Sequence, residues 1–432
     1  MTTSDTPYWW RAAPLSVVPQ TPVEPRSDVV IVGAGYTGLS AAITLARAGR
    51  SVQVFDKQKP GEGASSRNGG ITSGNLRPSF AQMTARFGEA RAAAILAESK
   101  AAREDLYRFI ADEKIDCDFK LVGRFNGALT QQEYDRMARE ADWLGTTLGI
   151  EAHAVPRDEQ RQFLGTDFYA GGSVRMDIGG LHPAKLHAAM LRLALEAGAL
   201  IHGETAVLGI RQDADDYEVS TARGTVRAND VIVSTNGYSD TSDRWLRRRL
   251  VPVRSRIIAT APISANLMGA LMPRRMMCGE TRKLHYYYRP SPDGTRILFG
   301  GRDGTIAGEP DWPTEALRTA LVDIFPEVQD VEIEHSWYGY VAMNRDMVPR
   351  IFSRAGKRYA AGYCGSGVVW ARWAGAKAAM QVLGAEDGAS ALDFQAPGYV
   401  PLIAGKAWFM PAVFAWMRHQ DRATMKQRSR QP

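Results

Sequence analysis

Short apolar runs and helical patterns alternate along the first part of the chain. Residues 28–32 (DVVIV) form an apolar run of β-branched residues, which predicts a strand buried in a parallel sheet. Residues 33–38 break this run with three glycines, and residues 39–49 then carry apolar side chains on one helical face. Residues 51–55 (SVQVF) return as a strand. Together these segments predict one compact βαβ unit.

Further along, the pattern predicts helices at 84–113, 131–149 and 183–198, the last with Pro183 in its first turn. From residue 250 to residue 335 short, aromatic-rich runs (IIATAPIS, LHYYYRP and TRILFGG) predict antiparallel strands with a helix beside them. A last apolar strand (KRYAAGY) meets a glycine-rich turn and another helix. The predicted fold class is α/β: a Rossmann-type domain with a second, α+β domain built on a mainly antiparallel sheet.

Composition narrows the class of protein. The chain has 432 residues, 45% of them hydrophobic and 23% charged, which suits a globular enzyme of about two or three domains. The net charge of +6 is scattered along the chain, so it favours attraction of a small acidic substrate over binding of nucleic acid. Three widely spaced cysteines form no disulfide framework and no metal-ligand motif, which favours a reducing cytoplasm.

The N-terminal segment carries no targeting pattern. It is polar, Pro-rich and aromatic, and lacks the basic and apolar regions of a signal peptide. No apolar run in the chain approaches the ~18 residues of a membrane span. We therefore expect a soluble, cytoplasmic protein with no membrane span, whose N-terminal segment wraps around a domain.

The first glycine-rich turn, at 33–38 (GAGYTG), lies between the first strand and its helix. Gly33 allows a tight turn, Gly35 lets a backbone approach a pyrophosphate, and Gly38 allows close packing of helix on strand. Asp56 ends the second strand and can accept the ribose hydroxyls of an adenosine, which argues against the 2′-phosphate of NADP. The turn predicts a dinucleotide site; the alternative is a tight turn that binds nothing.

Two more glycine-rich segments follow strands. Residues 61–70 (GEGASSRNGG) offer small residues to a large flat ligand, with Arg67 for phosphate charge. Residues 362–367 (GYCGSG) precede a helix whose N-terminus can stabilise negative charge on a reduced flavin ring. Alone, each fits an ordinary loop or turn. Glycine-rich strand-to-helix turns at opposite ends of the chain favour a long dinucleotide lying across the sheet over a nicotinamide cofactor.

The order of these motifs resembles one known family. DVVIVGAGYTGLSAAITLARAG is followed by FDK, GASSRNGG, STNGYS, MNRDMVPRI and GYCGSGV, between about residue 25 and about residue 420. This set is similar to the D-amino-acid oxidase-like FAD-dependent oxidoreductases, closest to the branch of γ-glutamylputrescine oxidoreductase and the glycine and sarcosine oxidases. The ordered set is far more specific than any single motif.

The resemblance implies FAD as the cofactor. The FAD phosphates would meet the first glycine-rich turn, Val207 would bond the adenine edge, and the last motif would lie under the isoalloxazine ring. The expected FAD-binding residues are Gly33, Ala34, Gly35, Tyr36, Thr37, Gly38, Asp56, Lys57, Gly63, Ala64, Ser65, Ser66, Arg67, Asn68, Gly69, Gly70, Val207, Gly237, Gly339, Cys364, Gly365, Ser366, Gly367 and Val368.

The chain also departs from the family pattern. Relatives have Gly-aromatic-Ser-Gly-His-Gly at the last motif, where this chain has Cys364 and Ser366. Val368 and Val369 stand where sarcosine oxidases have an aromatic residue and a carboxylate-binding lysine, so sarcosine is not an expected substrate. Gly339 stands where those enzymes attach FAD through a cysteine, so we expect non-covalent FAD.

The residues that contact substrate are less clearly marked, and no catalytic residue is assigned because the flavin carries the chemistry. Tyr286 and Tyr288 are candidates, since one face of their strand would meet the core and the other a pocket. Arg302 follows two glycines at a strand end and is a candidate anion clamp. Its alternative role is a surface pair with Asp303 or Glu309.

Further cations near this strand are candidates as well. Arg282, Lys283 and Arg289 could also clamp an anion, with surface solvation as the alternative for each. His285 is interpreted as a structural histidine.

The resemblance and the charge predict FAD-dependent oxidation of the C–N bond of a small amine or amino acid with a carboxylate, γ-glutamyl or phosphonate group. The imine would hydrolyse to a carbonyl compound, with O2 or a quinone as electron acceptor. The alternatives are a hydroxy-acid or alcohol dehydrogenase, and an RNA-directed flavoprotein that oxidises no amine.

The expected division has a discontinuous FAD-binding domain at 25–90, 155–245 and 335–400, and a substrate domain at 91–154 and 246–334. Residues 401–432 form a C-terminal helix and a basic tail. The aromatic strip in that helix favours docking on the substrate domain over a membrane surface.

Overall fold

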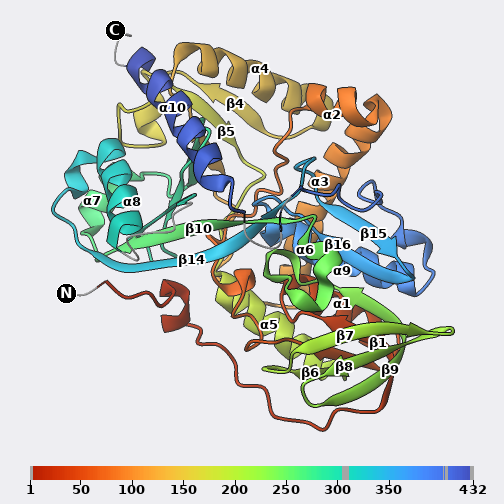
Figure 1. The fold of residues 1–432 in the computed structure, drawn as a ribbon. Helices are drawn as coiled ribbons and strands as arrows, with labels where there is room; N and C mark the ends of the chain where they lie inside the picture. The colour runs from red at the N-terminus through yellow and green to blue at the C-terminus, as the bar shows by residue number, and fades with distance from the viewer. Residues whose placement is uncertain (1–2, 304–310, 402, 404–406, 429–432) are drawn as a thin grey trace.

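The computed structural model describes residues 3–303, 311–401, 403 and 407–428. They form two eight-stranded sheets and the helices that cover them (Figure 1). The α/β fold class, with a parallel Rossmann-like sheet and a second, mainly antiparallel sheet, is confirmed.

The first sheet is mainly parallel. Its strand order is β15-β16-β9-β1-β2-β6, with the β7–β8 hairpin joined to β9. The central strand, β1, pairs in parallel with β2 on one side and β9 on the other, which explains its unbroken apolar run. The strands are β1 (Arg26–Val32), β2 (Val52–Phe55), β6 (Leu200–His202), β7 (Val207–Asp213), β8 (Asp216–Thr221), β9 (Gly224–Val233), β15 (Arg350–Arg354) and β16 (Lys357–Ala361).

The second sheet has the order β14-β10-β13-β12-β11-β3-β5-β4, and its pairs are antiparallel except that of β11 with β3. Figure 1 shows its long strands β10 and β14 running from the second sheet towards the first. The strands are β3 (Arg124–Gly127), β4 (Ala152–Val155), β5 (Gly172–Arg175), β10 (Val251–Thr260), β11 (Met277–Glu280), β12 (Tyr287–Pro290), β13 (Ile297–Gly301) and β14 (Ile333–Met343).

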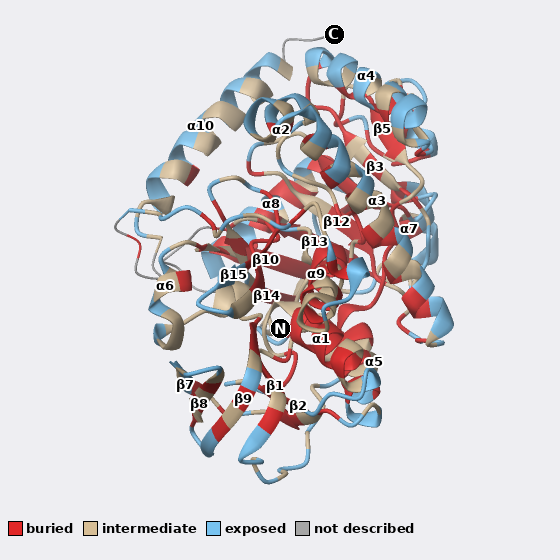
Figure 2. Cartoon of the chain, turned by 90° about the vertical axis from the view of Figure 1, so that its right-hand side faces the viewer, coloured by how far each residue is buried: buried red, intermediate tan, exposed pale blue. Residues whose placement is uncertain are grey.

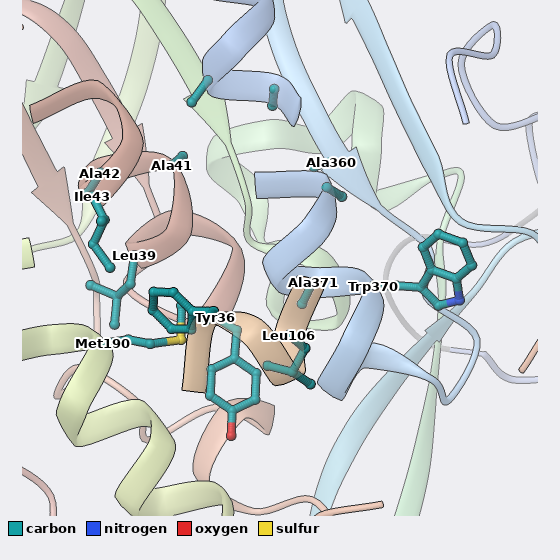
Figure 3. Packing of buried hydrophobic residues seen from close by; sticks show 14 of the residues in the cluster. Tyr36, Leu39, Ala41, Ala42, Ile43, Leu106, Met190, Ala360, Trp370 and Ala371 are labelled. Carbon is teal, nitrogen blue, oxygen red and sulfur yellow. The ribbon is translucent and has the colours of Figure 1, made fainter. Parts of the chain in front are cut away.

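The described helices that pack on the first sheet include α1 (Tyr36–Arg47), α5 (Pro183–Glu196) and α9 (Gly367–Val382). Helices α1 and α9 approach closely because Gly375 has no side chain; an added Cβ would lie 2.2 Å from the carbonyl oxygen of Thr37. Figure 2 shows α1 buried along nearly all of its length, and in Figure 3 Leu39 points towards Met190 of α5.

The predicted helix at 84–113 is two helices, α2 (Phe80–Phe87) and α3 (Glu89–Asp112). Gly88 separates them with a φ of +83°, a conformation that glycine adopts without strain. Ser79 starts α2 with a capping box to Gln82. A single glycine inside a helical pattern does not by itself predict a break, so the sequence pattern missed it.

The remaining helices accompany the second sheet or join the two. Helices α7 and α8 lie beside the second sheet, and α4 and α10 lie near its other end in Figure 1. Their bounds are α4 (Gln131–Leu148), α6 (Arg244–Arg247), α7 (Ala265–Leu271), α8 (Asp311–Ile324) and α10 (Met410–Arg428).

Sheet membership differs from the expected segments at three places. β5 lies in the segment 155–245 but pairs with β3 and β4 in the second sheet. β14 pairs with β10 along its length, although most of it lies in the segment 335–400. Helix α3, in the segment 91–154, packs into the core of the first sheet. These strands and this helix are placed by long-range pairing and packing that no local pattern encodes; the rest of the division remains a prediction.

Both ends of the described chain pack against the rest of the molecule. In the 3₁₀ turn Tyr8–Arg11, Trp9 is fully buried and its Nε1 donates to the carbonyl oxygen of Asn68 at 2.8 Å. On α10, Phe414 packs beside Leu284, and the carboxylate of Asp421 accepts two backbone N–H groups of the second domain. Within the described ranges, no helix combines the length and apolar character that crossing a membrane requires.

Candidate active site

The first glycine-rich turn leads from β1 into α1. Gly33 has a φ of +106°, and a Cβ added at Gly38 would lie 1.8 Å from the carbonyl oxygen of Gly33, so helix and strand can meet only without a side chain there. A Cβ at Gly35 would lie 2.8 Å from Oγ of Ser65, and this hydroxyl accepts the N–H of Tyr36 at 2.9 Å. The loop at 61–70 therefore lies directly against the N-terminus of α1.

Asp56 follows β2 and holds the turn. Its Oδ2 accepts the N–H of Ala34 at 2.8 Å and its Oδ1 accepts the N–H of Gln58 at 3.0 Å. Burial raises the pKa of the Asp56 carboxyl, and the two backbone hydrogen bonds oppose that shift. The carboxylate thus fixes the backbone of the turn while it lines the adjoining cavity.

Side chains of the loop at 61–70 mostly hold the loop itself. The hydroxyl of Ser66 donates to the carbonyl oxygen of Gly61 at 2.7 Å and accepts Nε1 of Trp10 at 2.8 Å. Arg67 donates to the carbonyl oxygen of Glu62 at 2.6 Å, with its guanidinium 4.6 Å from the ring centre of Trp10. The N-terminal segment fastens this loop, a role that the sequence pattern did not reveal.

The last glycine-rich turn joins β16 to α9. Cys364 has a φ of +52° between Gly362 and Gly365, which also have positive φ, so the turn is a sharp left-handed bend. The Cys364 thiol donates to the carbonyl oxygen of Gly362 at 3.1 Å, and burial raises its pKa to about 11, which keeps it protonated. Helix α9 begins without a side-chain cap, so its first N–H groups can meet negative charge.

These turns surround an elongated cavity of about 180 Å³ that runs along the carboxyl ends of the parallel strands. Most of the residues expected from the sequence line it: Gly33, Gly35, Tyr36, Thr37, Asp56, Lys57, Gly63, Ala64, Ser65, Asn68, Val207, Cys364, Gly365, Gly367 and Val368. Arg67, Gly69, Gly339 and Ser366 line a second, adjoining cavity instead.

Five expected residues line neither cavity: Ala34, Gly38, Ser66, Gly70 and Gly237. Sequence reasoning also missed lining residues, among them Ser234, Thr235, Asn236, Tyr238, Tyr340 and Tyr363. The motif STNGYS at 234–239 was the available signal for the first four of them, because it follows β9 at the same edge of the sheet.

The second cavity has a volume of about 410 Å³, within the range of small-molecule sites, and lies between the two sheets. It shares Ala64, Asn68, Tyr340, Val341 and Gly365 with the first cavity, so the two adjoin. A small ligand in the second cavity would therefore lie next to a dinucleotide in the first.

One residue of the aromatic strand faces this cavity, and it is neither of the two candidate tyrosines chosen from the sequence. Tyr287 lines it, whereas Tyr286 and Tyr288 do not. Tyr288 is fully buried, with its hydroxyl 3.1 Å from that of Tyr169. Tyr287 lies over Gly300, where an added Cβ would meet the ring at 2.4 Å. The alternation was predicted, but the register that decides which face is open is set by the neighbouring strands.

Arg302 lies at the end of β13 and lines the second cavity. The alternative pair with Asp303 does not form, because Asp303 accepts from Nε of Arg254 at 2.8 Å and from Nε of Arg256 at 2.9 Å. Glu309, the other alternative, lies outside the described residues. Burial lowers the pKa of Arg302, and no carboxylate pairs with it in the part of the chain that the structure describes.

The other candidate cations have different positions. Arg282 lines the cavity and pairs with Glu280 at 3.2 Å. Lys283 is exposed. Arg289 is buried and donates to the carbonyl oxygens of Gly70 and Leu181. His285 lines the cavity, so its interpretation as purely structural does not describe its position.

The model of the FAD dependent oxidoreductase family matches residues 28–381. The chain belongs to this family. It is similar to a probable oxidoreductase OrdL of Rhizobium meliloti, with 29% identity over 96% of this chain and 97% of the relative. It is also similar to the γ-glutamylputrescine oxidoreductase of Escherichia coli, with 29% identity over 81% of this chain and 82% of the relative. The resemblance seen in the sequence is confirmed.

Solved structures agree on the fold of this FAD-dependent oxidoreductase. The glycine oxidase of Geobacillus kaustophilus matches with a TM-score of 0.71 and 22% identity, over 84% of this chain and 96% of that one. Membership of the family implies FAD, and the residues present fit it. Small residues leave room at both turns, α9 offers an uncapped N-terminus, and the elongated cavity joins Asp56 and Val207 to Cys364.

Proposed function

We propose that this FAD-dependent oxidoreductase oxidises the C–N bond of a small amine or amino acid that carries an anionic group. The observation that carries the proposal is the second cavity, which adjoins the dinucleotide cavity and holds Arg302, for which the described part of the chain provides no carboxylate partner. An aromatic wall with a few placed polar groups is typical of a small-molecule site. Relatives named for γ-glutamylputrescine and for glycine agree with an amine bearing an acidic group.

The residues of the chain would bind and orient the substrate. Arg302 can hold a carboxylate or phosphonate by two parallel hydrogen bonds, and Tyr287 offers its ring as an apolar wall. FAD, when bound, supplies the acceptor for a hydride equivalent from the carbon next to nitrogen. The imine product is released into solvent, where it hydrolyses to a carbonyl compound and an amine. Catalysis by the protein then consists mainly of positioning.

The test is anaerobic reduction of the flavin by a panel of compounds. We expect amines and amino acids with an acidic group to bleach the oxidised flavin absorbance, and the matched amines without that group to bleach it slowly. Release of ammonia or an amine identifies C–N oxidation. Bleaching by hydroxy acids alone would instead establish the dehydrogenase alternative. Reoxidation of the reduced enzyme by O2 or by a quinone then identifies the electron acceptor.

We expect FAD to be bound without a covalent link. Gly339 has no thiol, and the thiol of Cys364, the cysteine among the residues lining the two cavities, is protonated and hydrogen-bonded to the backbone. Acid precipitation should therefore release the yellow flavin into the supernatant. Flavin fluorescence that stays with the denatured chain on a gel would contradict this prediction.

A further inference from the structure

The second cavity carries far more positive than negative charge. Among the described residues that line it are seven arginines and two carboxylates, Glu140 and Glu280. Both carboxylates already have arginine partners, Arg136 at 3.6 Å and Arg282 at 3.2 Å. The positive excess is therefore not neutralised by the acidic side chains of the cavity wall.

Four of these arginines have no carboxylate partner in the described ranges: Arg67, Arg77, Arg124 and Arg302. Arg67 instead donates to the carbonyl oxygens of Glu62 and Tyr338, which leaves Arg77, Arg124 and Arg302 for a ligand. The side chain of Arg124, on β3, makes no hydrogen bond within the described residues, and its Nε is buried without a partner. Arg77 donates from Nε to the carbonyl oxygen of Cys364 at 3.1 Å and from Nη1 to Nδ1 of His285, which leaves Nη2 beside the cavity without a hydrogen-bond partner in the described chain. Guanidinium groups that are buried without a partner lower the stability of the folded protein unless an anion pairs with them.

Arg77, Arg124 and Arg302 line the same cavity, and two of them face one point. A Cβ built at Gly365 would lie 2.8 Å from Nη2 of Arg302 and 3.2 Å from Nη2 of Arg77, so both guanidinium groups face that point. His285 also lines this cavity, with its Nδ1 3.2 Å from Nη1 of Arg77. Burial and the charges of the three arginines hold the pKa of His285 well below its usual range.

The histidine is therefore neutral, and its hydrogen-bonding role follows from its neighbour. A guanidinium only donates, so Nδ1 of His285 accepts from Arg77, and Nε2 must carry the proton. Burial lowers the pKa of Arg77 to about 10, and the charges of Arg302 and Arg124 act in the same direction. Guanidinium groups and the Nε2–H of His285 thus line a cavity whose two described carboxylates are already paired with other arginines.

We propose that this cluster of Arg77, Arg124 and Arg302 binds the end of a substrate that carries two negative charges. The substrate class is then an amine that bears either a phosphonate or phosphate dianion or two carboxylates. One anionic charge can engage Arg302 and Arg77 beside Gly365, and the second can engage Arg124. This inference rests on the proposed function for the amine end, but anion binding itself can be measured without turnover.

The experiment compares dianions with a monoanion on the FAD-loaded enzyme. Malonate, methylphosphonate and acetate are titrated at alkaline pH, where the first two carry two charges, and binding is followed by calorimetry and by perturbation of the flavin spectrum. We expect at least one dianion to bind about 10- to 100-fold more tightly than acetate, because it gains further charge-assisted hydrogen bonds. Malonate alone would identify two carboxylates, and methylphosphonate alone a phosphonate or phosphate group.

Arg124→Met is the decisive variant, because this side chain has no hydrogen bond in the described chain that the change would break. We expect it to bring dianion affinity down to that of acetate and to leave acetate affinity within about three-fold. It should also raise the melting temperature of the anion-free enzyme, since an uncompensated cation is removed. Arg124→Lys should restore part of the preference. The control is Arg192→Met, on the surface of α5, where Arg192 pairs with Glu196.

Two results would overturn the proposal: dianions that bind no more tightly than acetate, or a dianion preference that survives in Arg124→Met. Neither result depends on amine oxidation. A failed amine oxidation would appear separately, as a flavin that no amine bleaches while the dianions still bind.

Discussion

A Gly35→Val variant is expected to fold and to purify without FAD. Gly35 lines the dinucleotide cavity, and a Cβ there would lie 2.8 Å from Oγ of Ser65, closer than such contacts allow. The branched side chain would also cover the backbone that a pyrophosphate must approach. Its backbone φ is −84°, which valine adopts without strain, so the loss should fall on the cofactor rather than on the fold.

Absorbance of the purified protein and its far-ultraviolet circular dichroism test this separation. The control is Gly269→Val, because nothing lies within 4 Å of a Cβ added there. Asp56→Ala should weaken FAD binding less, by the ~1.5–3 kcal/mol typical of charged hydrogen bonds, since it loosens the turn and removes an acceptor. An equal loss in Glu151→Ala, at an exposed acid, would argue against the role of Asp56. A flavin-loaded Gly35→Val protein would contradict the assignment of the turn.

The dinucleotide half of the site could be predicted from the sequence because its signals are local. The run at 28–32, the glycine spacing after it and Asp56 at the end of the next strand all lie within one βαβ unit. Secondary structure therefore brings them together wherever the unit forms. The turn at 362–367 could be placed for a similar reason, because β16 pairs in parallel with β9 and ends at the same edge of the sheet.

The substrate half could not be predicted in the same way. The choice of Tyr287 over Tyr288 depends on the register of β12 with β11 and β13, in which glycines 279 and 300 stand opposite Tyr287. Arg77 and Arg124 are isolated arginines in a loop and a short strand, far along the chain from Arg302. Arg124 and Arg302 line one cavity because β3 and β13 belong to the same sheet, and Arg77 reaches it from a loop that contacts Cys364. A sequence pattern can select a single arginine at a strand end, but it does not show which other arginines lie near it in the folded chain.

An Arg302→Ala variant is expected to raise KM for an acidic amine by about 10- to 100-fold, with a smaller change in kcat. Val369 stands where the resemblance to sarcosine oxidases implies a lysine, so an anionic substrate, as proposed, would need another cation here. Arg302 lines the cavity beside Gly365, and its neighbour Asp303 is occupied by Arg254 and Arg256. Each lost charge-assisted hydrogen bond typically costs ~1.5–3 kcal/mol, which the alanine cannot recover.

Steady-state kinetics with the first active amine test this expectation. Arg302→Lys should recover only part of the loss, because an ammonium cannot reproduce the planar fork of a guanidinium. Arg192→Ala serves as the control, since its ion pair with Glu196 is on the surface. The same amine without its acidic group should be turned over alike by the wild-type and the Arg302→Ala enzymes, because it never engages the guanidinium. If kcat/KM for the acidic amine were unchanged in Arg302→Ala, or if the preferred substrate carried no anionic group, Arg302 would not be the clamp, and the FAD site would be unaffected by that outcome.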